Sequence, residues 1–200
     1  MPSRNDDLLL RAAELEREVE AELSQTRAKW RYRVEAGRIR FERDARLAHE
    51  RLKQSIPRFL RESSPLNILT APVVYSLIVP VAIVDLWISV YQALCFPIYG
   101  ITRVRRSAYI VIDRQHLAYL NGIEKLNCVF CGYSNGVFAY VREVAARTEQ
   151  YWCPIRHARG VSAPHAHYHE FVEFGDANGY QRRLPLLRAE LHEKPADKDR

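Results

Sequence analysis

The sequence predicts a mainly α-helical chain with a small α+β module, and three observations support this prediction. Residues 1–62 repeat apolar positions at helical spacing, which predicts one long amphipathic helix. Residues 63–102 contain a single charged side chain, Asp85, and read as a membrane anchor. Residues 103–192 hold three of the four cysteines and read as a small metal-binding module. The charged residues 193–200 are expected to form a disordered tail.

The charge distribution favours a lipid surface over nucleic acid as the partner. The 200 residues carry a net charge of +6, but the arginines of the first third alternate with Glu and Asp. Other arginines flank the apolar block on both sides. A nucleic-acid-binding chain would instead gather its positive charge into one patch. We therefore expect a bilayer, and no nucleic acid, as a binding partner.

The N-terminal repeat has a period of eleven residues. Five apolar residues stand at this interval: Leu8, Val19, Trp30, Phe41 and Leu52. Eleven residues in three turns keep these side chains on one side of a nearly straight helix, here predicted over residues 7–56. Such a stripe predicts self-association or binding of a protein partner. Packing on the C-terminal module, or along the lipid surface, is the alternative.

The apolar block is too long for one perpendicular crossing of a membrane. As a single helix, residues 66–99 would measure about 50 Å, against a hydrocarbon core of about 30 Å. Prolines at positions 72, 80 and 97 interrupt the block. We therefore predict a membrane hairpin or re-entrant helix that bends near Pro80 and Asp85. A single tilted or kinked span is the alternative.

The flanks of the block indicate its orientation. Arginines stand on both sides of it, at positions 58 and 61 and at positions 103, 105 and 106. Because cytoplasmic flanks carry the excess of Lys and Arg, we expect both termini in the cytoplasm of a bacterium, at the inner membrane. Asp85 is then expected near the hairpin turn, within reach of water or headgroups. The alternative is a proton or cation relay in a small transport component.

Four residues of the C-terminal module have the spacing of a tetrahedral metal site. Their pattern is C-x2-C-x21-C-x3-H, formed by Cys128, Cys131, Cys153 and His157. This ligand set predicts a structural zinc ion that supplies folding energy. Buried reduced cysteines are the alternative.

Three more histidines alternate along the chain, and any of them could replace His157 as the fourth ligand: His165, His167 and His169. On a strand all three would face the same way. We interpret them as a solvated strand edge. A second, open metal site with Glu170 or Glu173 as a base is the alternative.

The module is also expected to contain β-structure. Residues 107–113 are rich in β-branched side chains and predict a short strand. Residues 169–174 and 180–184 predict a β-hairpin, joined by a turn at residues 175–179 that contains two glycines.

Two resemblances bear on the module. The six residues Cys128-Val-Phe-Cys-Gly-Tyr133 resemble the first half of a rubredoxin-type iron site. The second half of that site is Cys-Pro-x-Cys-Gly, whereas Cys153-Pro154 is followed here by Ile-Arg-His, so zinc is favoured over iron. Residues Ile112 to His157 resemble a family of uncharacterised bacterial membrane proteins, a resemblance that implies no activity.

The function predicted from these features is that of a membrane-anchored, zinc-stabilised scaffold or interaction protein. The sequence contains no nucleophile elbow, phosphate-binding loop or dinucleotide fingerprint, which lowers the expectation of an enzyme. One alternative is a membrane-associated metal-dependent enzyme or iron redox carrier that uses the histidines or the cysteines. Another is a transport component that uses Asp85.

Overall fold

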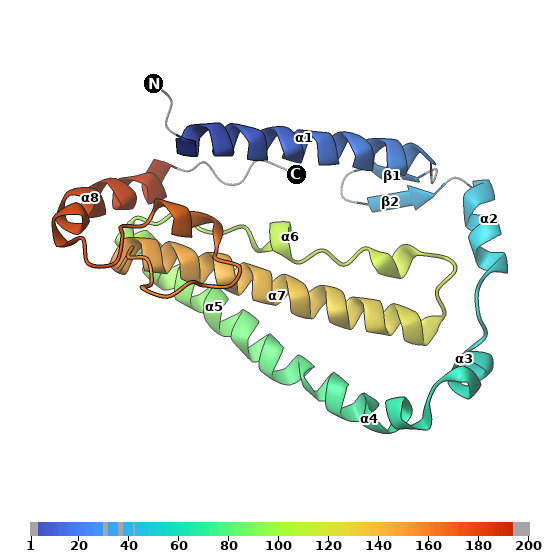
Figure 1. The fold of residues 1–200 in the computed structure, drawn as a ribbon. Helices are drawn as coiled ribbons and strands as arrows, with labels where there is room; N and C mark the ends of the chain where they lie inside the picture. The colour runs from blue at the N-terminus through green and yellow to red at the C-terminus, as the bar shows by residue number, and fades with distance from the viewer. Residues whose placement is uncertain (1–3, 30–31, 36–37, 42, 194–200) are drawn as a thin grey trace. The chain divides into compact units, whose positions relative to one another are not determined.

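The structure is a computed structural model that describes residues 4–29, 32–35, 38–41 and 43–193 (Figure 1). The chain divides into two compact units. Unit 1 consists of Met1–Glu62 and Asp113–Lys125, and unit 2 consists of Ser63–Ile112 and Leu126–Arg200.

Unit 1 contains short elements in place of the long helix predicted over residues 7–56. They are α1 (Arg4–Lys29), β1 (Tyr32–Glu35), β2 (Arg38–Phe41), α2 (Arg43–Arg51), α3 (Ile56–Glu62) and the 3-10 turn η1 (Arg114–His116). The prediction of one helix is therefore wrong. Residues 32–35 and 38–41 alternate bulky apolar with charged side chains, a period of two that suits a strand. The two strands pair antiparallel, with Tyr32 opposite Phe41. Trp30 lies outside the described residues.

A cluster of three aromatic rings and a helix cap order the second half of unit 1. The His49 ring on α2 packs edge-on against Phe41 and Tyr119, with ring centroids 5.3 and 5.2 Å apart. Asn121 precedes the long helix α7 (Gly122–Trp152), which begins in unit 1 and continues into unit 2. The Asn121 side chain accepts the amides of residues 123 and 124, and the Glu124 carboxylate accepts the amide of Asn121. This reciprocal capping box fixes where α7 starts.

Unit 2 is helical. Besides α7, it contains α4 (Pro65–Ser76), α5 (Ile78–Tyr99), the single turn α6 (Arg106–Tyr109), the 3-10 helix η2 (Ala166–Glu170) and α8 (Ala177–Glu193). Together α4 and α5 form a 35-residue stretch, Pro65–Tyr99, that is long and apolar enough to cross a membrane.

The chain does not turn back between α4 and α5, so the predicted membrane hairpin is wrong. Leu77 joins the two helices with φ −62° and ψ −17°, which are right-handed helical values. Pro80 lies in the first turn of α5, where a missing backbone N–H breaks no helical hydrogen bond. The stretch ends at Gly100, which adopts a left-handed conformation with φ 69°.

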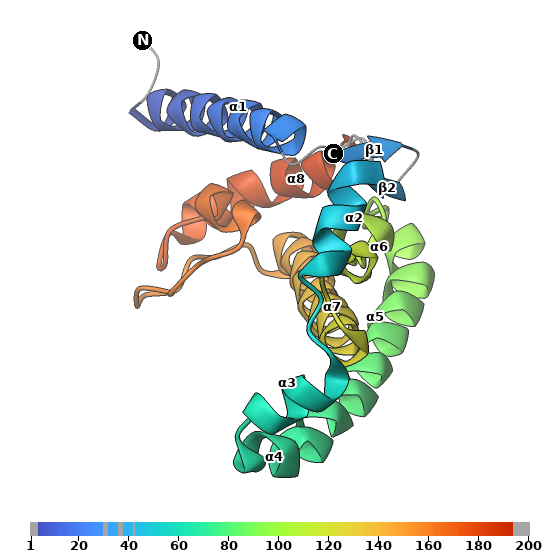
Figure 2. The same ribbon diagram turned by 90° about the vertical axis from the view of Figure 1, so that its right-hand side faces the viewer.

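Helix α7 runs in the same direction as α4–α5, and the two separate toward α4 (Figures 1 and 2). The Tyr75 hydroxyl bonds to Asn127 near the start of α7, and Tyr99 stacks on Tyr151 near its end, with centroids 5.2 Å apart. Residues 100–112, the return segment, connect the end of α5 back toward the start of α7. A side chain on Gly136 would approach backbone atoms of residues 109 and 110 at 2.8 Å, so glycine permits this close approach.

The core of unit 2 lies where α5, the return segment, α7 and α8 meet. It is built by six buried side chains: Phe96, Ile101, Val104, Tyr140, Val144 and Leu191. Gln150 on α7 donates to the carbonyl of Leu187, and the amide of Thr102 donates to the carbonyl of Leu191, at 2.8 and 3.1 Å. These bonds hold α8 against the rest of the unit.

The prediction of an α+β module over residues 103–192 is wrong, because the described residues in this range contain no strand. Residues 107–113 form the turn α6 and an extended stretch. Residues 177–193, which include the second strand of the predicted hairpin, form α8. Asp176 starts this helix, because its carboxylate accepts the amide of Gly179 at 2.8 Å. Residues 194–200 of the predicted tail lie outside the described residues.

Candidate functional site

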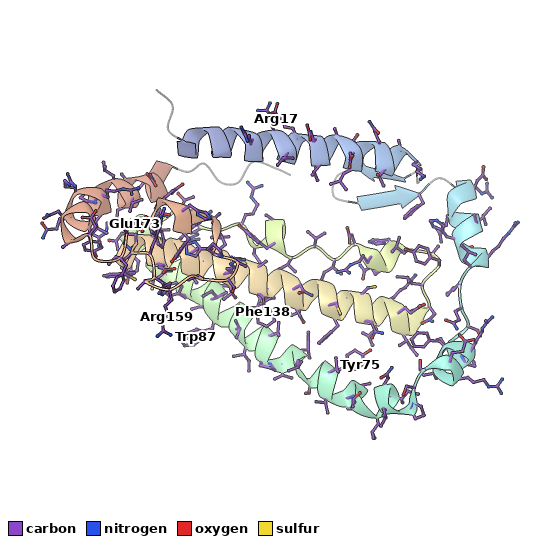
Figure 3. All side chains as sticks on the ribbon, viewed as in Figure 1. Arg17, Tyr75, Trp87, Phe138, Arg159 and Glu173 are labelled. Carbon is purple, nitrogen blue, oxygen red and sulfur yellow. The ribbon has the colours of Figure 1, made fainter. Side chains whose placement is uncertain are left out.

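Helix α5 buries a partly polar face and exposes an apolar one. The buried face consists of Val81, Asp85, Gln92 and Phe96. The exposed face continues onto α4, and we call the two together the outer face: Leu66, Leu69, Val73, Ile83, Leu86, Trp87, Leu94 and Ile98. Trp87 is 74% exposed and is drawn on the side of α5 opposite α7 (Figure 3). A continuous apolar surface of this length marks an interaction with lipid or protein.

Asp85 lies in the middle of the apolar stretch but is buried and paired. It is 6% exposed and accepts two hydrogen bonds from Arg106 of the return segment, at 2.9 and 2.6 Å. The Tyr133 hydroxyl on α7 donates a third bond at 2.8 Å. The expectation that Asp85 reaches water or headgroups at a hairpin turn is therefore wrong. Its carboxylate ties three segments of unit 2 together.

A second polar contact between the same three segments is centred on Gln92. Its side-chain oxygen accepts the amide of Val104 at 3.0 Å, and its amide nitrogen donates to the carbonyl of Val104 and to the hydroxyl of Tyr140. The bonds of Asp85 and Gln92 satisfy polar groups that burial would otherwise leave without partners. Together, the hydrogen bonds of Asp85 and Gln92 fix which face of α5 packs against α7.

Two carboxylate–histidine pairs join α7 to residues 165–170. His167 Nε2 lies 3.2 Å from Glu143 Oε1, and His165 Nε2 lies 3.0 Å from Glu149 Oε2. Arg147 also donates to Glu143, at 2.8 Å. Burial opposes the charge on Glu143, but the bonds from His167 and Arg147 outweigh it and lower the pKa of this carboxyl from 4.5 to about 2.

The three alternating histidines do not share a face. Residues 166–170 form η2 instead of a strand, so the alternation of the three histidines does not place all of them on one face. His165 and His167 contact the carboxylates of α7, whereas His169 is exposed and its carbonyl accepts a bond from Arg156. The interpretation of these histidines as a strand edge is therefore wrong.

The structure does not bring the four predicted zinc ligands together. Cys128 and Cys131 lie in the first half of α7, and Cys153 directly follows its end. At 1.5 Å per helical residue, Cys128 and Cys153 are roughly 37 Å apart along the axis. His157 stacks instead on Tyr168, with centroids 6.2 Å apart. In the part of the chain that the structure describes, no three His, Cys, Asp or Glu residues are grouped to hold a metal ion, which corrects the predicted zinc module.

No protein-family model, curated protein or solved structure matches this chain. The resemblances of residues 112–157 and 128–133 therefore stay predictions. The candidate site rests on its geometry alone.

The sequence did not predict the roles of several residues in these sites, notably Tyr133, Glu143 and Glu149. One available signal was the pair Gly132 and Gly136, a G-x-x-x-G motif within the uncharged residues 126–141. This motif is typical of a helix face that another backbone approaches closely. Both glycines are buried on α7. No local pattern pointed to the carboxylate partners, because these contacts join residues far apart in the sequence.

Proposed function

We propose that this protein attaches to a lipid bilayer through the outer face of α4–α5 and acts there as a scaffold. The observation that carries the proposal is the outer face itself, a line of large aliphatic and aromatic side chains that remains exposed along the whole stretch. In water such a surface is costly, at roughly 25 cal/mol for each Å² of apolar area. Insertion into the acyl region of a membrane removes this cost.

The geometry of unit 2 favours a helix that lies along the membrane over one that crosses it. A perpendicular crossing would carry α7 and the return segment to the same depth, because both run alongside α5. The return segment is mostly non-helical and carries Arg103, Arg105 and Arg106. Irregular backbone and arginines are unfavourable in contact with hydrocarbon. We infer that only the outer face enters the bilayer and that both ends of the stretch stay on one side.

The charges at the two ends support a cytoplasmic position. Arg61 precedes the stretch, and Arg103 and Arg105 follow it, all with exposed side chains. Positive residues at both ends suit the anionic cytoplasmic leaflet. With the resemblance to bacterial membrane proteins, we propose the cytoplasmic face of a bacterial inner membrane as the location, with both termini in the cytoplasm.

The scaffold part of the proposal rests on α1. Leu15, Val19 and Leu23 stand four residues apart and are all exposed, so they form an apolar stripe on one side of this helix. Exposed glutamates occupy positions 14, 18 and 22 beside it. An apolar stripe flanked by charges is the pattern of helices that associate with one another. We propose that α1 pairs with α1 of a second copy of this chain.

Flotation with liposomes tests the attachment. The full chain, synthesised without detergent in the presence of phosphatidylcholine vesicles, is expected to float with them. Leu86→Glu combined with Leu94→Glu should abolish flotation, because each charge on the outer face is costly to insert, by about 2 kcal/mol or more. The control Leu186→Glu makes the same change at an exposed leucine of α8 and should float normally. Equal flotation of all three proteins would refute the attachment.

Chemical crosslinking in detergent tests the pairing of α1. The wild-type chain is expected to give a crosslinked dimer, and Val19→Glu should remove it by placing a charge in the apolar stripe. The matched control Ala21→Glu adds the same charge at an exposed position on the opposite face of α1. A dimer that survives Val19→Glu would contradict pairing through this stripe.

A further inference from the structure

Unit 1 contains a groove with no role in the fold described above. It consists of two adjoining cavities of about 550 and 490 Å³, and Glu50 and Lys53 line both. One wall comes from α2 and the residues that lead into α3. The other wall comes from residues 115–125, which end at the start of α7.

The groove is positively charged. Arg46, Lys53 and Lys125 line it against one carboxylate, Glu50, and Arg46 pairs with Glu50 at 3.1 Å. Among the residues that the structure describes, neither Lys53 nor Lys125 forms an ion pair. His116 adds a further nitrogen donor or acceptor to the same lining. An anion would therefore find two lysines available.

One residue of the lining, Asn121, also carries a buried donor without a protein partner. Asn121 is 1% exposed and lines the smaller cavity. Its oxygen caps α7, but its Nδ2 has no hydrogen-bond partner among the described residues. Leaving a buried donor unpaired costs about 1–3 kcal/mol. The adjacent N-terminus of the 31-residue helix α7 favours negative charge as well. An oxyanion bound in the smaller cavity would have Asn121 and Lys53 in its lining, with Lys125 in the lining of the adjoining one.

We propose that this groove binds the phosphate of an anionic lipid headgroup. Only Ser63 and Ser64 separate the end of α3 from the start of the apolar stretch at Pro65. Ile56 and Leu60 on α3 are exposed, so this short helix also offers apolar side chains to a lipid surface. The inference rests on the proposed membrane attachment. Free inorganic phosphate shares the same chemistry, and the experiment below distinguishes the two sources.

Titration calorimetry on the detergent-solubilised full chain tests the groove. Short-chain phosphatidylglycerol is the probe, short-chain phosphatidylcholine the uncharged control, and inorganic phosphate the soluble alternative. Wild type is expected to bind phosphatidylglycerol in preference to both. Lys53→Gln with Lys125→Gln should weaken this binding by about tenfold or more, because two charge-assisted bonds are lost. Asn121→Asp keeps the oxygen that caps α7 but replaces the donor with a negative charge, and should weaken binding similarly.

The control variant Arg17→Gln with Arg43→Gln removes the same charge outside the groove and should change the affinity by less than about twofold. Circular dichroism checks that every variant retains its helices. Phosphatidylglycerol affinity unchanged in the lysine variant would overturn the groove. Inorganic phosphate that binds as tightly as the lipid would overturn the lipid source. Neither result affects flotation on phosphatidylcholine vesicles, so failure of the groove and failure of the attachment are distinguishable.

Discussion

Arg106 on the return segment forms a bidentate ion pair with Asp85 on α5. Its Nε donates to Oδ1 at 2.9 Å, and its Nη2 donates to Oδ2 at 2.6 Å. The Asp85 side chain is nearly buried, whereas that of Arg106 is about half exposed. Arg106→Gln therefore leaves the buried Asp85 carboxylate without its ion-pair partner, and should lower the unfolding free energy by about 3 kcal/mol. Asp85→Asn should cost less, because the freed guanidinium can reach water.

A double-mutant cycle in denaturant, on the detergent-solubilised chain, measures this coupling. Asp85→Asn with Arg106→Gln should recover part of the loss caused by Arg106→Gln alone. Strictly additive losses would mean that the two side chains do not interact. If the Asp85→Asn protein kept the full unfolding free energy of wild type but lost a transport activity, the transport alternative would be favoured instead.

Gly136 permits the contact between α7 and the return segment. Gly136→Ala would place a methyl group 2.8 Å from the Ile110 Cα and the Tyr109 carbonyl, and should destabilise the chain by about 1–3 kcal/mol. Gly160→Ala is the control, because no atom lies within 4 Å of the methyl group it would add. Thermal unfolding of both variants checks this prediction. Equal midpoints would show that the return segment does not pack where the structure places it.

The lowered pKa of Glu143 predicts that the folded chain loses stability in acid. Its pKa is lowered from 4.5 to about 2 in the folded chain, so its contribution is complete above pH 4.5. As the pH falls from 4.5 to about 2 the carboxyl takes up a proton and this contribution, at most about 3 kcal/mol, is lost. Unfolding free energies measured over this range should fall more steeply for wild type than for Glu143→Gln. Parallel curves would contradict the pairing with His167 and Arg147.

Metal removal is expected to leave the fold unchanged. The helix separates Cys128 from Cys153 by roughly 37 Å, so one ion cannot bind both. Dialysis against a zinc chelator should not shift the unfolding midpoint, and Cys128→Ser with Cys131→Ser should cost less than about 1 kcal/mol. A midpoint that drops on chelation and returns with added zinc would contradict the described path of α7.

The sequence predicted features that depend on local composition. The apolar character of residues 63–102 was evident because nearly every charge is missing there, and the structure contains the corresponding apolar helical stretch. The hairpin prediction failed because proline was treated as a break. Pro80 instead occupies the first turn of α5, where it is tolerated.

The predictions that failed in the C-terminal region depended on tertiary contacts. Cys128-x2-Cys131 suggests a metal-binding turn in isolation, but both residues lie inside α7, which packs against the return segment at Gly136. The histidines of residues 165–169 alternate as in a strand, yet two of them bind carboxylates 16 and 24 residues away. Those partners are set by how the chain folds back, which no local pattern encodes. In the N-terminal region, the eleven-residue period also continued through residues 32–41, where a period-two alternation was present as well.

The central claim, that the outer face lies along one side of a bilayer, is tested most directly by the depth of spin labels. A variant with all four cysteines replaced by alanine would carry one new cysteine at Leu69, Ile83 or Ile98, and the labelled protein would be reconstituted in vesicles. The in-plane account predicts similar shallow depths, within about 10 Å of the headgroups, and access to all three labels from the same side. A deep label at Ile83 between shallow labels on opposite sides would contradict it and establish a transmembrane helix.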